Sequence, residues 1–180
     1  MPMQPHVFSG GATGEWRIRA VRTLCGPELP AATHLSVGFS VVEGAAWTLR
    51  GTVSNLRYTT RPERDALRAS QAPLARGEAS RATLIPIAKT AAWWEMAQDE
   101  RRALFEEVSG HTRIGMAALP AVARRLHHAR DLGEPFDFLT WFEYAPAHEA
   151  TFDALLAALR ATPEWSYVDR EIELRLERAG

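Results

Sequence analysis

The feature that most constrains the fold is an order of elements, strand–strand–helix–strand, that is predicted twice along the chain. Alternating apolar residues indicate the strands, and apolar residues at helical spacing indicate the helices. These elements are residues 35–41, 47–58, 60–71 and 84–89 in the first half, and residues 119–129, 136–144, 147–161 and 165–178 in the second. Two such units predict an α+β fold of two ferredoxin-like halves, with antiparallel sheets and helices packed on one face.

Local signals support several of these boundaries. Thr60 and Glu63 have the spacing of a helix capping box, with a proline between them in the first turn. Glu43-Gly44 predicts a turn that joins the first two strands as a hairpin, and Gly133 predicts the corresponding turn of the second half. Both halves are therefore expected to contain a hairpin followed by a helix and a strand.

The remaining segments complete the predicted domain organisation. An additional strand is expected at residues 15–24 and an additional helix at residues 94–109. Residues 1–14 are rich in glycine, proline and small side chains, which predicts a flexible N-terminal arm. The rest is expected to form a single domain, residues 15–180, whose N-terminal half covers about 15–90 and whose C-terminal half covers about 91–180.

Composition excludes several classes of protein. Among the 180 residues 46% are hydrophobic, which is enough for a core, and the formal net charge is −1. This balance indicates no nucleic-acid partner, which would need a basic stripe. The single Cys25 excludes an intramolecular disulfide framework and fits a reducing compartment. No signal peptide and no apolar run of about 20 residues is visible, so a soluble cytoplasmic protein is expected.

Arg124 is the most unusual residue among the predicted strands. It shares a strand face with Val122 and Leu126, where a guanidinium needs a partner, a ligand or a path to solvent. With Gly133 near the middle of the hairpin, facing residue numbers sum to about 266, which places Arg124 opposite Phe142 and Leu126 opposite Thr140. The pattern predicts a dry pocket with one fixed positive charge, suited to a small oxyanion. The alternative is an edge-strand arginine whose stem covers apolar surface.

Histidines offer few metal-site patterns. His127 and His128 are adjacent on a strand and point to opposite faces, so they cannot bind one metal together and are interpreted as structural. His111 follows a predicted helix and Gly110, and a single histidine taken alone is more often a surface or core residue than a ligand. Ser-His-Asp, HExxH and glycine-rich phosphate-loop patterns are all absent.

The ordered set Lys89, Trp93-Trp94, His111 and Arg124, at these spacings, resembles the haem-dependent chlorite dismutase family in its short, dimeric lineage. The resemblance extends from about Trp47 to Arg175. It implies a member of the dimeric α+β barrel superfamily, in which two ferredoxin-like halves form a barrel-like core. It also implies haem b as cofactor, a homodimer, and chlorite and other small anions as ligands of the iron.

The resemblance also implies roles for individual residues. His111 would be the proximal ligand of the haem iron, and Glu164 with nearby Lys89 would hold its second ring nitrogen, which fixes the tautomer and makes the ligand more basic. Arg124 would be the distal arginine, which in this family lies thirteen residues after the ligand. The other implied site residues are Trp93 and Trp94 beside the haem and Gln71 hydrogen-bonded to the distal arginine, and the hairpin register adds Thr140 and Phe142 to the same pocket.

Three functions are compatible with this resemblance. The first is a haem enzyme that converts chlorite to chloride and dioxygen. The second is a coproheme decarboxylase, although those relatives typically carry glutamine where this chain has Arg124. The third is a haem-binding or sensing protein without turnover. Oxygen evolution on addition of chlorite separates the three.

Overall fold

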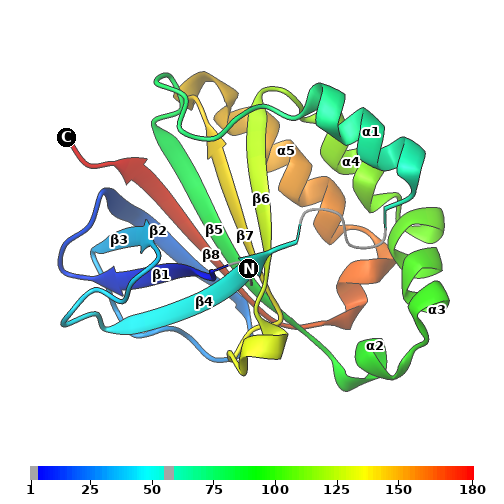
Figure 1. The fold of residues 1–180 in the computed structure, drawn as a ribbon, viewed down its shortest axis with the longest axis horizontal. Coiled ribbons are helices and arrows are strands. Elements are labelled where there is room, and N and C mark those ends of the chain that lie inside the picture. The colour runs from blue at the N-terminus through cyan, green and yellow to red at the C-terminus, as the bar shows by residue number, and fades with distance from the viewer. Residues whose placement is uncertain (1–3, 55–58) are drawn as a thin grey trace.

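The computed structural model describes residues 4–54 and 59–180, and the strands of this part of the chain close into one antiparallel barrel (Figure 1). Around the barrel the order is β1-β3-β2-β8-β5-β7-β6-β4. The α+β architecture is therefore confirmed, with the two predicted sheets merged into a continuous one. The strands are β1 (His6–Gly11), β2 (Trp16–Cys25), β3 (His34–Gly38), β4 (Trp47–Val53), β5 (Arg81–Lys89), β6 (Val122–His128), β7 (Phe138–Tyr144) and β8 (Val168–Arg178).

The α-helices gather on one side of the barrel, away from β1 to β4 (Figure 1). The α-helices are α1 (Arg61–Ser70), α2 (Ala91–Glu95), α3 (Gln98–Arg102), α4 (His111–Ala117) and α5 (Glu149–Arg160), and the π-helical or 3-10 segments are η1 (Ala103–Val108), η2 (Arg130–Leu132), η3 (Pro146–His148) and η4 (Pro163–Tyr167). In the described part of the chain, none of these helices has the length and apolar character that a membrane span requires.

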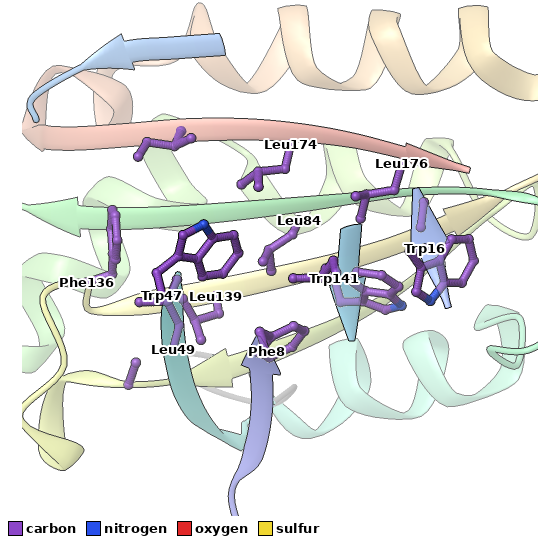
Figure 2. Close-up of a cluster of buried hydrophobic side chains, with 14 residues drawn as sticks. Phe8, Trp16, Trp47, Leu49, Leu84, Phe136, Leu139, Trp141, Leu174 and Leu176 are labelled. Carbon is purple, nitrogen blue, oxygen red and sulfur yellow. The ribbon is translucent and has the colours of Figure 1, made fainter. Parts of the chain in front are cut away.

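The main hydrophobic core fills the inside of the barrel. Figure 2 shows side chains of several strands converging there, among them Phe8 of β1, Leu84 of β5, Trp141 of β7 and Leu174 of β8. A second core lies between the opposite face of β5 and β7 and helix α5, where Phe142 packs against Phe152 with ring centroids 5.0 Å apart. Because successive side chains of a strand point to opposite faces, β5 and β7 contribute to both cores.

The prediction of a flexible arm at residues 1–14 is wrong for residues 6–11, which form β1. Phe8 is fully buried in the barrel. Gly10 lies so close to Trp47 that an added Cβ would be 2.1 Å from the indole ring. Gly10, one of the small residues that suggested a loose segment, therefore allows Trp47 to pack across this strand. Residues 1–3 lie outside the described residues.

The position of β1 also overturns the predicted hairpin of residues 35–41 and 47–58. β3 and β4 do not pair with each other, because β1 lies between them and pairs with both. The end of the predicted second strand, residues 55–58, lies outside the described residues. In contrast, the capping box of Thr60 and Glu63 at the start of α1 is confirmed.

The single helix predicted over residues 94–109 is divided into several segments. Thr90 caps the short helix α2, and α3 then begins anew, where the backbone N–H of Ala97 donates to the Glu100 carboxylate at 2.7 Å. The π-helical η1 follows and ends before Gly110, whose left-handed φ of 63° reverses the chain. Helix α4 then starts at His111, where no helix was predicted.

Candidate functional site

A cavity that opens to solvent lies between the outer face of strands β5 to β7 and helices α4 and α5. Its walls are mostly apolar, with Ile85 and Ile87 from β5 on one side and Leu155 and Leu159 from α5 on the other. Seven of the nine residues predicted for the site line this cavity, namely Lys89, Trp93, His111, Arg124, Thr140, Phe142 and Glu164. The other two, Gln71 and Trp94, lie outside it.

His111 is held in one orientation by a buried carboxylate. Its Nδ1 lies 2.7 Å from Oε2 of Glu164, whose side chain is buried. Within residues 4–54 and 59–180, Nε2 of His111 forms no hydrogen bond or ion pair. A carboxylate that accepts a hydrogen bond from Nδ1–H fixes the tautomer in which Nε2 carries the free lone pair. His111 therefore presents a nitrogen that can bind a metal at the cavity wall.

Lys89 completes a buried triad with Glu164 and His111. Its Nζ lies 2.7 Å from Oε1 of Glu164, and both side chains are almost fully buried. Burial alone would raise the pKa of the Glu164 carboxyl, but the charge and hydrogen bond of His111, together with Lys89, lower it to about 2. Burial lowers the pKa of the Lys89 ammonium, and Glu164 partly offsets this. The triad therefore keeps a carboxylate charge against the imidazole.

Strand pairing explains how these distant residues meet. Lys89 is the last residue of β5 and pairs with Val168, the first residue of β8. Glu164 lies in η4, four residues before Val168, and its backbone N–H donates to Oγ of Ser109 at 3.0 Å. Because Ser109 immediately precedes the Gly110 turn into α4, this contact brings the carboxylate to the start of the helix that carries His111.

The surroundings of the imidazole are aromatic on the protein side and open toward the cavity. Phe105 of η1 stacks on His111, with ring centroids 4.2 Å apart and planes 21° apart, and Trp165 lies farther away at the same interplanar angle. Gly115 lies one helical turn after His111 and lines the cavity. No atom lies within 4 Å of the position that its Cβ would occupy, so this turn of α4 leaves free space beside the imidazole.

Arg124 lies on the strand wall of the same cavity. The predicted register is confirmed, since Arg124 pairs with Phe142 and Leu126 pairs with Thr140. Burial lowers the pKa of the Arg124 guanidinium. In the described part of the chain no acidic side chain forms an ion pair with it. A half-buried cation without a protein anion leaves its charge available to a ligand.

The two neighbouring tryptophans have different surroundings. Trp93 lines the cavity, is 1% exposed, and its Nε1 has no hydrogen-bond partner among the described residues. Trp94 instead donates its Nε1 hydrogen to Asp137 at 3.0 Å and stacks on Phe138. Of these two neighbouring tryptophans, only Trp93 is therefore positioned to contact a molecule in the cavity.

Gln71 lies at the C-terminal end of α1, and its side chain is exposed. Its Nε2 donates to the backbone carbonyl of Arg124 at 3.1 Å. The hydrogen bond that the resemblance implies between Gln71 and Arg124 is therefore present, and it is made with the main chain of the arginine. Through this bond Gln71 ties α1 to the middle of β6.

Asp137 is a supporting residue to which the sequence analysis gave no role. It is buried, and its Oδ2 accepts hydrogen bonds from the backbone N–H of Lys89 at 2.7 Å and from the Trp94 indole. It therefore connects the end of β5 to α2. The only signal in the sequence is an isolated acid between Phe136 and Phe138, which indicates a buried partner without identifying it.

Comparisons with known proteins identify the family. No protein-family model matches this chain. It is similar to the crystal structure of a dimeric chlorite dismutase from Nitrobacter winogradskyi, with 55% identity and a TM-score of 0.92 over 97% of this chain and 99% of that one. It is also similar to a chlorite dismutase from Candidatus Nitrospira defluvii in complex with imidazole, with 26% identity and a TM-score of 0.57 over 80% of this chain and 56% of that one.

A curated relative gives the same result over a shorter region. Chlorite dismutase from Ideonella dechloratans is 34% identical over 92 residues, which are 51% of this chain and 30% of that protein. This chain thus matches under a third of the Ideonella protein but nearly the whole of the Nitrobacter structure. With that full-length match, the chain belongs to the chlorite dismutase family.

Proposed function

We propose that this protein is an enzyme that binds haem b through His111 and converts chlorite to chloride and dioxygen. One observation carries the proposal: an imidazole fixed by a buried carboxylate and an arginine without an acidic partner in the described residues line the same apolar cavity. The first arrangement suits an iron ligand, and the second suits a small oxyanion. The family membership supports both assignments.

The residues present fit a haem. The cavity has a mostly apolar lining with a few polar side chains, as small-molecule and cofactor sites do. Gly115 leaves room beside His111, as a flat ring system approaching Nε2 would require. Trp93 lines the same cavity and would lie beside the bound group.

When bound, haem supplies the redox-active iron at which the O–Cl bond of chlorite can be cleaved. The protein then contributes three things. The Glu164 carboxylate accepts a hydrogen bond from Nδ1–H of His111 and so makes the ligating nitrogen more basic. Arg124 offers a fixed positive charge to the oxyanion and to the oxychlorine fragment derived from it. The apolar side chains of α5 and β5 limit water, which strengthens that electrostatic attraction.

The proposal is tested by adding chlorite to the haem-loaded protein and measuring dissolved oxygen. Chlorite contains the atoms of one chloride and one dioxygen, so we expect close to one dioxygen per chlorite consumed. Free haem at the same concentration is the control. A haem-loaded protein that evolves no oxygen would contradict the proposed activity and indicate a haem-binding protein or an enzyme of other chemistry.

Glu164→Gln should raise the reduction potential of the bound haem. The variant removes the charge that makes the imidazole basic, and a less basic ligand stabilises ferric iron less. Spectroelectrochemistry of the loaded variant and the wild type measures the difference. A potential equal to that of the wild type would show that Glu164 does not act on the ligand.

We also propose that the protein is a homodimer, because the Nitrobacter relative is described as dimeric and this chain covers 99% of it. Light scattering coupled to size-exclusion chromatography should give the mass of two chains. A mass of one chain, or of five, would exclude a dimer.

A further inference from the structure

Trp165 connects the site to a second group of buried charges. It follows Glu164 in η4 and lines the cavity. Its ring is 21° from parallel to the His111 imidazole, with centroids 6.4 Å apart, and the Lys89 ammonium lies 5.6 Å from its ring centroid. Trp165 therefore touches the surroundings of two members of the triad while it is covalently bonded to the third.

The indole of Trp165 is held by a hydrogen bond to a residue of β8. Its Nε1 donates to Oε2 of Glu171 at 2.8 Å, and Glu171 is 2% exposed. Arg160 of α5 holds the other carboxylate oxygen through Nε at 2.8 Å and Nη2 at 2.6 Å. A buried carboxylate needs such a partner, and a buried indole N–H needs an acceptor, so the three side chains form one connected unit.

We propose that Glu171 is a positioning residue for the proximal side of the site. Its hydrogen bond to Trp165 fixes the orientation of η4, and η4 places the Glu164 carboxylate on His111. The backbone of η4 is anchored at its two ends, by Ser109 at Glu164 and by the N–H of Thr90, which donates to the Tyr167 carbonyl at 2.8 Å. The Trp165–Glu171 bond is the side-chain anchor between them. The inference rests on the proposed haem ligation by His111.

Glu173 provides a matched control on the same strand. It lies two residues after Glu171 on the same face of β8, is 1% exposed, and also binds Arg160, at 2.7 Å. Its remaining partner is Arg175, at 2.6 Å, and it forms no hydrogen bond with Trp165 within the described residues. Replacing either glutamate removes a buried negative charge from Arg160, but only the Glu171 variant also removes the acceptor for the indole.

The test is the reduction potential of the haem-loaded full chain in four single variants and one double variant. Trp165→Phe keeps every charge and a ring but lacks the N–H, so it should raise the potential in the direction of Glu164→Gln by a smaller amount. Glu171→Leu should do the same. Glu171→Gln keeps an acceptor oxygen and should stay near the wild type, and Glu173→Leu should also stay near it. Adding Glu171→Leu to Glu164→Gln should cause no further shift, because the effect passes through Glu164.

Several outcomes would overturn the inference. If Glu171→Leu and Glu173→Leu shift the reduction potential equally, loss of a buried charge explains the effect. The same holds if Glu171→Leu and Glu171→Gln shift it equally. An unchanged reduction potential in Trp165→Phe would also overturn the inference. This variant keeps the buried ion pairs, so it remains informative if a glutamate variant fails to fold. In the haem-free chain, the Trp165 indole proton should exchange with solvent faster in Glu171→Leu than in wild type, and an unchanged exchange rate would contradict the bond itself.

The failure of this inference differs from failure of the proposed function. If His111→Ala leaves the haem spectrum unchanged, the ligand assignment is wrong and the potentials carry no information on Glu171. If His111→Ala changes the spectrum while Trp165→Phe leaves the potential unchanged, only the positioning role of Glu171 is wrong.

Discussion

His111→Ala should remove the proximal ligand and abolish the normal ferric haem spectrum, either by loss of haem or by a change of ligation. The imidazole offers the only nitrogen in the described cavity lining that is both a good iron ligand and held by a carboxylate. Removal of the side chain leaves a space next to Phe105. Added imidazole should therefore occupy it and restore much of the original absorption band.

His148→Ala is the control for this variant. His148 is exposed in η3, before α5, and lies away from the cavity lining. Its haem content and spectrum should match those of the wild type. A normal ferric spectrum in His111→Ala, without added imidazole, would show that another residue binds the iron and would remove the basis of the proposed function.

The strand face of the site could be predicted from the sequence because its geometry is local. Side chains of a strand alternate between faces, and the Gly133 turn sets the register of β6 on β7. These two facts place Arg124, Thr140 and Phe142 together without knowledge of the rest of the fold. The helical face could not be derived in this way, because Lys89 and Glu164 are 75 residues apart and meet only through the pairing of β5 with β8.

Other features were missed because the decisive contact is distant in sequence. Gly10 and its neighbours have the composition of a flexible arm, but they pair with β3 and β4, and Trp47 packs across Gly10. Asp137 lies between two phenylalanines just before β7, and Glu171 lies in β8 among several other charged residues. Both side chains are buried and therefore need partners. The sequence does not reveal that those partners are the indoles of Trp94 and Trp165, which belong to segments that pack beside the strands.

Arg124→Ala should fold and bind haem but lose most of its oxygen yield. Because no acidic side chain of the described residues pairs with Arg124, its removal leaves no buried carboxylate without a partner. If the guanidinium holds the oxychlorine fragment after the O–Cl bond breaks, its loss allows hypochlorite to escape and to bleach the haem. Loss of a charge-assisted contact costs about 1.5–3 kcal/mol, or roughly one to two decades in the affected step.

The decisive measurement is the total oxygen evolved before inactivation, with and without a hypochlorite trap. The trap should slow bleaching of Arg124→Ala far more than that of the wild type.

Arg124→Lys keeps the charge but not the planar fork, so its yield should be intermediate. Gln71→Ala should weaken retention slightly, since it loosens only the main chain of Arg124, and Arg68→Ala, on the exposed side of α1, should change nothing. If Arg124→Ala evolves as much oxygen as the wild type and the trap has no effect, Arg124 is a structural strand residue and the retention mechanism is wrong.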